Sequence, residues 1–250
     1  MIKQFNDPNF KKQVQLLRQQ HPDERIMSFT YQDNLYWLKQ PEKLTGFEKI
    51  LKAQPLKSFQ CELQRLISLT NQGAPVPPLM LWDKDFFVLA DAGRNLRGLM
   101  NDYRDDEQKS HQLLQQAIAA LVQLHQKNII HGRPALRDML YKNGQISFVD
   151  FESFSKSRNL NWLKARDGLI FIHNLGRIAS FSDERLYQII AEYQQACDPI
   201  VWQTMVKFIR QYHWLYLLLT IFKPVARKDL IAIYRLFQQF DKFLATSNSH

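Results

Sequence analysis

The stretch IIHGRPALRDMLYKNGQISFVDFESF, residues Ile129–Phe154, decides how this chain is interpreted. Its apolar start is interrupted at His-Gly-Arg-Pro, and two strand-like segments then flank an Asn-Gly pair, which is a preferred dipeptide of tight hairpin turns. Asp138 and Asp150 lie on either side of this predicted hairpin, and Arg133 stands five residues before the first of them. The hairpin therefore predicts that the two carboxylates come together.

The second strand of this hairpin is predicted to run through QISFVDFE, residues 145–152. Side chains alternate between the two faces of a strand, so Phe148 and Asp150 are expected on one face and Val149 and Phe151 on the other. An acid that faces inward beside aromatic side chains needs a cation or a cationic side chain as a partner. The sequence thus predicts an inward-facing Asp150.

The whole chain has 250 residues, 45% of them hydrophobic, which suits one domain with two lobes or two small domains. Its net charge of +9 favours contact with phosphates, nucleic acid or an anionic membrane surface. Cys61 and Cys197 lack metal-binding spacing and are expected to be buried free thiols.

Membrane insertion is not expected from the pattern of apolar residues. The N-terminus has no apolar signal core, and the run WLYLLLTIF, residues 214–222, is far shorter than the ~20 residues that span a bilayer. We expect a cytoplasmic protein and leave open a peripheral contact with the inner face of the membrane. Residues 208–228 could be interpreted as a lipid-binding segment. We favour the other interpretation, which is a buried core helix followed by a basic cap.

Residues 1–94 are predicted to form strands with one main helix. A short amphipathic helix is expected within residues 1–20, and IMSFTYQDNLYWLK, residues 26–39, reads as a hairpin. Ser58 is expected to cap a helix that Gly73 ends, and two further strands should flank a turn at Asp83–Asp85.

Residues 95–250 are predicted to be mostly helical. Apolar residues recur at helical spacing from Asp106 to Lys127, and the hairpin with the two acids follows. Further helices are expected near residues 162–179, 183–196, 199–222 and 227–245. The predicted fold class is α+β, with a small strand-rich N-terminal lobe and a larger helical C-terminal lobe.

This order of elements resembles the protein-kinase-like fold, and in particular bacterial lipopolysaccharide (Kdo) kinases and aminoglycoside phosphotransferases. Lys39 in YWLK ends the second strand, where the family places the lysine that holds nucleotide phosphates. Glu62 lies on the following helix, where the family places the carboxylate partner of that lysine. The resemblance covers about residues 26–180 and implies binding of ATP through Lys39 and Glu62.

The remaining motifs of the resemblance lie in and after the opening stretch. HGRPALRDML aligns with a catalytic loop that usually reads H-G-D-x-x-x-x-N-I-L, and VDFE aligns with the metal-binding D-F-G. The resemblance implies that Asp138, in place of the asparagine, and Asp150 bind Mg²⁺. It also implies structural roles for His131, which packs and hydrogen-bonds near the metal-binding segment, and for Asp167, which accepts backbone N–H bonds.

Three departures from the family pattern concern catalysis and nucleotide binding. Arg133 occupies the position of the catalytic aspartate, and it could pair with the two acids, or grip an anionic substrate or the γ-phosphate. No glycine precedes Gly46, so the first hairpin lacks the glycine-rich cover for phosphates. Glu152 replaces the glycine of D-F-G and is the nearby carboxylate that could replace the base. Arg133 and Glu152 are therefore the catalytic candidates.

Two classes of function remain open at this point. The first is an ATP- and Mg²⁺-dependent phosphotransferase of cell-envelope metabolism, with a sugar or lipid-linked hydroxyl as the acceptor. The second is a catalytically impaired pseudokinase that regulates or binds a partner, which Arg133 and the glycine-free hairpin favour. Transfer of AMP is a third possibility. A nucleic-acid-binding module is disfavoured because the basic residues are dispersed and no motif of that kind is present.

Overall fold

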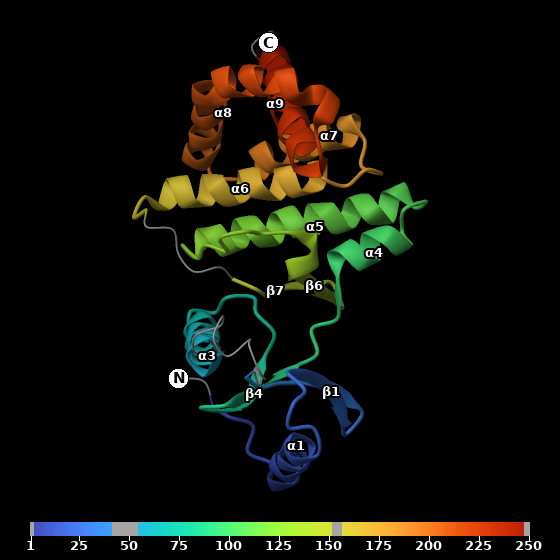
Figure 1. Ribbon diagram of the computed structural model, residues 1–250, viewed down its shortest axis with the longest axis vertical. Coiled ribbons are helices and arrows are strands. Elements are labelled where there is room, and N and C mark those ends of the chain that lie inside the picture. Colours follow the sequence, from blue (N-terminus) through green and yellow to red (C-terminus); the bar gives the residue numbers. More distant parts are fainter. Residues whose placement is uncertain (1–2, 42–54, 152–156, 248–250) are drawn as a thin grey trace. The chain divides into compact units, whose positions relative to one another are not determined.

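The computed structural model describes residues 3–41, 55–151 and 157–247 (Figure 1). Within these ranges the protein is α+β, as predicted, with many helices and two small antiparallel sheets. Contacts divide the chain into two compact units, Met1–Gly93 and Arg94–His250.

The first unit is built on a four-stranded antiparallel sheet with the strand order β1-β2-β4-β3. The hairpin predicted for residues 26–39 is present. Its turn residues Gln32 and Asp33 have φ values of 47° and 59°, which are typical of a two-residue hairpin turn. The strands are β1 (Ile26–Tyr31), β2 (Asn34–Lys39), β3 (Leu79–Asp83) and β4 (Phe86–Ala90).

Helix α1 (Pro8–Gln20) belongs to the core of this unit, a role that its sequence did not reveal. Phe10 and Val14 are fully buried in one cluster with side chains of the sheet. Phe10 lies 5.0 Å from Tyr36 between ring centroids, in an edge-to-face arrangement. The helix therefore packs on the sheet and adds apolar side chains to the core of this unit.

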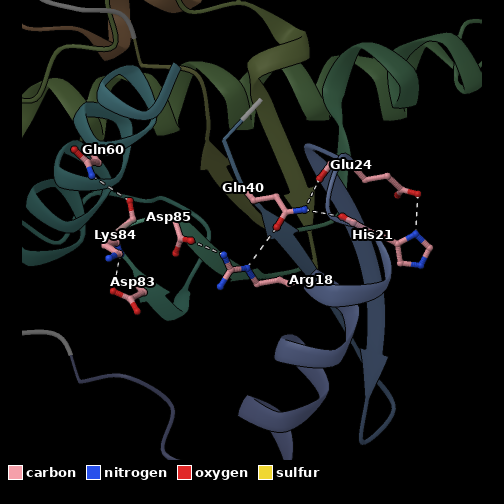
Figure 2. Close-up of polar contacts among 8 residues, drawn as sticks. All are labelled: Arg18, His21, Glu24, Gln40, Gln60, Asp83, Lys84 and Asp85. Atoms are coloured by element: carbon pink, nitrogen blue, oxygen red, sulfur yellow. Dashed lines mark hydrogen bonds and ion pairs between the residues drawn. The ribbon is translucent and has the colours of Figure 1, made fainter. Parts of the chain in front are cut away.

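Polar side chains tie the end of α1 to the sheet (Figure 2). Arg18 Nη2 lies 2.7 Å from Asp85 Oδ2, and Arg18 Nε donates to Gln40 Oε1 at 3.4 Å. The buried Gln40 in turn donates from Nε2 to the carbonyl oxygens of His21 and Glu24, both at 2.8 Å. These bonds fix the chain between α1 and β1 against the end of β2.

Helix α3 (Pro55–Asn71) packs on the same unit through Phe59 and Leu63. The predicted cap at Ser58 is wrong, because the helix begins at Pro55 and Ser58 lies inside it. Gly73, with φ of 66°, follows the end of the helix as predicted, because glycine adopts this left-handed conformation at low cost.

The second unit begins with a small sheet of strand order β5-β6-β7. The predicted hairpin around Asn143-Gly144 is present, and its pairing joins Met139 to Phe148. Strand β5 and helix α4 were not predicted, since two and seven residues are too few to establish a period. These elements are β5 (Arg94–Asn95), α4 (Leu96–Asp102), η1 (Leu136–Asp138), β6 (Met139–Lys142) and β7 (Gln145–Phe148).

Long helices form the rest of the second unit (Figure 1). Helix α6 contacts α7, α8 and α9, and α7 also contacts α5 and α9. The Arg235 side chain ties this group together, because its Nε lies 2.6 Å from Asp183 Oδ1 and its Nη1 donates to the Gly176 carbonyl at 2.8 Å. The helices are α5 (Glu107–Gln126), α6 (Leu160–Gly176), α7 (Asp183–Ala196), α8 (Pro199–Leu219), η2 (Thr220–Val225) and α9 (Lys228–Ser247).

Two predictions about burial are wrong. Residues 208–228 do not form a buried core helix, since Trp214, Ile221 and Phe222 are exposed. Cys61 is exposed as well, whereas Cys197 is buried, and both thiols are free. Among the helices that the structure describes, none has the length and apolar character needed to cross a membrane.

Candidate functional site

A buried carboxylate on α6 fixes the His-Gly-Arg-Pro segment. Asp167 is fully buried, and its two oxygens accept the backbone N–H groups of His131 at 2.8 Å and Gly132 at 3.0 Å. The ring of His125, on α5, lies 3.3 Å from the same carboxylate. Hydrogen bonds to a buried charge are among the stronger ones in proteins, so this side chain holds the loop firmly. The bracing role predicted for Asp167 is confirmed.

His131 links this loop to the segment that carries Asp150. Its Nε2 lies 2.9 Å from the Val149 carbonyl oxygen, and the Arg133 N–H points at its Nδ1 at 3.4 Å. A carbonyl accepts only, so Nε2 carries a proton and donates it to Val149. The ring also stacks on Phe151, with 4.7 Å between centroids. The structural role predicted for His131 is therefore confirmed.

Asp138 is positioned by the short helix η1 and by the hairpin. Its carbonyl oxygen accepts the Val149 N–H at 2.9 Å, which extends the pairing of β6 and β7 by one bond. Its side chain is only 6% exposed and lies 3.3 Å from Arg137 Nε. The Asp138–Arg137 pair gives this acid one partner on its own element.

The electrostatics of Asp138 connect it to the other charged residues of the opening stretch. Burial raises the pKa of its carboxyl, and the charge of Asp150 raises it further, whereas Arg137 and Arg133 lower it. The charges of Asp150 and Arg133 therefore both act on the Asp138 carboxyl.

Asp150 departs from its predicted geometry. Strand β7 ends at Phe148, and Asp150 has a φ of 57°, so the alternation expected from a continuous strand does not reach it. The residue is exposed and does not face inward beside the aromatic residues. A non-glycine residue in this left-handed region is uncommon and often marks a functional position. The sequence carries no signal for this local turn.

The first unit holds the other pair of candidate residues. Lys39 at the end of β2 donates a hydrogen bond from Nζ to Glu62 Oε1 on α3. The two side chains are 16% and 42% exposed, respectively, and Lys39 Nζ lies 5.7 Å from the centroid of the Phe87 ring. The ion pair expected between these residues is present, and it holds the lysine ammonium at the end of the strand.

Fewer contacts describe the two catalytic candidates, Arg133 and Glu152, than describe the acids. Arg133 is exposed and lies directly after Gly132 in the loop that Asp167 fixes. Glu152 lies outside the described residues. Residues of the described ranges contain no group of three or more His, Cys, Asp or Glu side chains arranged to hold a metal ion. A cation at Asp138 and Asp150 would therefore depend on two protein carboxylates and on water.

Two residues that support the loop were not singled out as functional by the sequence. His125 is a buried partner of Asp167, although it appears in the sequence only as one residue of an apolar helix face. Asn174 lies two turns after Asp167 on α6, and its Nδ2 donates to the carbonyl oxygens of Ile170 at 2.8 Å and Pro134 at 3.5 Å. Its spacing of seven residues from Asp167 placed both on one helix face, which is the signal that could have found it.

Together these contacts define an α+β protein whose second unit carries a braced loop followed by a hairpin with two acids. No protein-family model matches the chain. It is 44% identical over 232 residues to a protein of Haemophilus influenzae (strain ATCC 51907 / DSM 11121 / KW20 / Rd), described as an uncharacterized protein, across 93% of this chain and 96% of that one. The chain belongs to the same family as this Haemophilus protein.

The chain also aligns with a solved structure over most of its length. The ternary complex of APH(2")-IIa with streptomycin and ATP aligns with 95% of this chain and 97% of its own, at 12% identity and a TM-score of 0.36. A TM-score of this size does not establish a shared fold.

Proposed function

We propose that the protein is a kinase-like phosphotransferase that binds ATP with Mg²⁺. The observation that carries the proposal is the buried frame in which Asp167 holds the backbone of His131 and Gly132, while His131 holds Val149. This frame fixes the two segments that carry Asp138 and Asp150. Phosphoryl transfer requires positioned charge more than covalent chemistry by the protein, and a rigid frame of this kind supplies it.

Asp138 and Asp150 are the proposed ligands of Mg²⁺. Magnesium takes oxygen ligands and keeps several of its waters, so two carboxylates suffice. The donor set fits such an ion, because the charge of Asp150 already raises the pKa of the buried Asp138 carboxyl. A divalent cation would offset both the repulsion between the two carboxylates and the cost of burying the negative charge of Asp138. Bound Mg²⁺ would supply charge neutralisation for the phosphates.

Lys39 is the proposed ligand of the nucleotide phosphates. Its partner Glu62 accepts a hydrogen bond from the ammonium group and holds it at the end of β2. A lysine acts on phosphate as a compact point charge with three donors, so its position matters more than its exact orientation. The acceptor we propose is a hydroxyl of a sugar or lipid-linked molecule of the cell envelope.

A catalytically impaired pseudokinase is the second candidate, and Arg133 is the observation that favours it. This exposed arginine stands where an aspartate would orient the attacking hydroxyl, and its charge lowers the pKa of Asp138. In a pseudokinase, Arg133 competes with a cation for the acids. In an active enzyme, it binds the acceptor or the transferring phosphate, and Glu152 is the candidate base.

Calorimetric titration of the full chain with ATP, with and without Mg²⁺, tests the proposal. Asp150→Asn should weaken binding by about tenfold when Mg²⁺ is present and change it little in a chelator, because the carboxylate acts through the ion. Lys39→Met should weaken binding in both conditions. Asp102→Asn and Lys84→Met, which alter exposed side chains, are the matched controls. Absence of ATP binding to the wild-type protein would contradict the proposal.

Release of ADP, measured with Mg²⁺ titration, separates the two candidates. If the protein is an active phosphotransferase, Arg133→Ala should lower the rate of ADP release. If it is a pseudokinase, the wild type releases no ADP, and the same change should tighten Mg²⁺ binding. Arg137→Ala controls for the loss of one positive charge near Asp138. An unchanged rate together with unchanged Mg²⁺ affinity would contradict both roles of Arg133.

A further inference from the structure

Helix α8 has two apolar faces, and only one of them is covered. Val201, Met205 and Ile209 are buried at intervals of four residues. On the uncovered side, large apolar residues recur at positions i, i+3, i+4 and i+7 and continue into η2. They are Trp214 (64% exposed), Leu217 (55%), Leu218 (51%), Ile221 (71%), Phe222 (52%) and Val225 (74%), and we call them the apolar ridge.

Exposed large apolar residues are concentrated in the apolar ridge and are not spread evenly over the surface. It accounts for six of the fifteen large hydrophobic residues that are exposed in the described part of the chain, yet it spans only residues 214–225. Single exposed apolar side chains are normal on a protein surface, whereas a contiguous group of them marks an interaction site.

Along the chain segment that carries the apolar ridge the Asp, Glu, Lys and Arg residues are all basic, and Asp241 on α9 pairs with His213 at 2.9 Å. Residues 199–228 contain no aspartate or glutamate and five basic residues, all of them exposed. The nearest acid after this segment, Asp229, is already paired with Arg177 at 2.7 Å. The basic residues are Lys207, Arg210, Lys223, Arg227 and Lys228.

We propose that the apolar ridge binds the surface of a membrane that contains anionic lipids. Trp214, Phe222 and the aliphatic side chains would enter the boundary between headgroups and acyl chains, and Lys223 and Arg227 would contact the headgroups. An interfacial segment needs large apolar side chains and flanking positive charge, and a negative lipid surface complements both. This inference does not depend on the proposed function.

A lipid surface fits these observations better than a protein partner does. A stable protein interface also needs hydrogen-bonding groups that match those of its partner. The six residues of the apolar ridge offer only one side-chain donor, the indole N–H of Trp214, and that group is typical of membrane–water boundaries. Binding to a lipid surface does not require the apolar ridge to match the shape of a specific partner.

Co-sedimentation of the full chain with lipid vesicles tests the proposal. We expect binding to vesicles of phosphatidylcholine mixed with phosphatidylglycerol, and weaker binding to vesicles of phosphatidylcholine alone. The double variant Ile221→Ser/Phe222→Ser should lower the partition coefficient by at least about tenfold, because two large apolar side chains leave the bilayer. Lys223→Gln/Arg227→Gln should lower binding to the mixed vesicles and reduce its dependence on salt.

Matched controls use residues of the same kind outside the apolar ridge. Ile200→Ser changes a 55% exposed isoleucine at the other end of α8, and it should leave binding within about twofold of wild type. Lys84→Gln removes a positive charge from the first unit. All substituted side chains are exposed, so circular dichroism and thermal melting should show unchanged folding.

Three results would overturn the proposal. The wild-type protein could fail to sediment with the mixed vesicles. The ridge variant and Ile200→Ser could bind equally well. Analytical ultracentrifugation could instead show a dimer that Ile221→Ser/Phe222→Ser converts to monomer, with no vesicle binding, in which case a second copy of the chain covers the apolar ridge.

Discussion

Replacing Asp167 by asparagine tests whether its carboxylate holds the loop from His131 to Arg133. The substitution keeps the size of the side chain but exchanges one acceptor oxygen for an NH₂ group. In the structure both oxygens accept backbone N–H groups, from His131 at 2.8 Å and from Gly132 at 3.0 Å. The amide keeps one of these bonds, without the charge, and places a donor against the other N–H.

The expected cost of Asp167→Asn follows from these contacts. A hydrogen bond to a charged group contributes roughly 1.5–3 kcal/mol, and a buried donor left without a partner costs roughly 1–3 kcal/mol. The side chain is fully buried, so solvent does not screen the loss. We expect the free energy of unfolding to fall by about 2–4 kcal/mol, which lowers the melting temperature by roughly 4–16 °C in a protein of this size.

Urea unfolding followed by circular dichroism measures this loss. Asp102→Asn is the control, because Asp102 pairs with Arg94 at 2.6 Å while both side chains are about half exposed or more. Exposed ion pairs contribute little to stability, so this variant should melt close to wild type. Equal and small shifts for the two variants would refute the idea that Asp167 fixes the loop.

Three further predictions concern buried and reactive groups. Tyr193→Phe should raise the free energy of unfolding in urea by about 1 kcal/mol, because the Tyr193 hydroxyl is buried with no hydrogen-bond partner among the described residues; a loss of stability would reveal a partner. A thiol reagent should modify only Cys61 in the native protein and Cys197 only after unfolding, since Cys61 is exposed and burial raises the pKa of Cys197 to about 12; modification of both native thiols would contradict this burial. Burial raises the pKa of Asp138 above its ordinary value of 3.8, so the folded state binds this proton more tightly than the unfolded state does. In the presence of a chelator, the free energy of unfolding of the wild type should therefore decrease relative to that of Asp138→Asn as the pH rises from the unfolded pKa of Asp138 to its higher folded pKa. Parallel pH profiles for the two proteins would show that burial does not act on this carboxyl.

Local sequence determined many of the elements and several contacts of the candidate site. The turn at Asn143-Gly144 and the strands beside it follow from backbone preferences that act within a few residues. The bounds of α7, Asp183–Ala196, agree with its predicted range, since Ser182 caps it and accepts the Arg185 N–H. The bracing role of Asp167 came from the resemblance of its motif to a known family.

Tertiary structure decided the geometry of the acids. The exposed, left-handed Asp150 could not be read from the alternation of QISFVDFE, because the strand ends at Phe148 and alternation holds only within a strand. The burial of Asp138 depends on η1 and on its bond to Val149, which are contacts between separate segments.

Tertiary structure also decided which apolar faces are covered. The sequence predicted helices over both α1 and α8, but a helix prediction does not reveal whether another element packs against the apolar residues of the helix. Phe10 of α1 is buried in the core of the first unit, whereas Trp214 and Ile221 of the apolar ridge are exposed. The free energy of an apolar side chain depends on the area removed from water, and that area is set by neighbours distant in the chain.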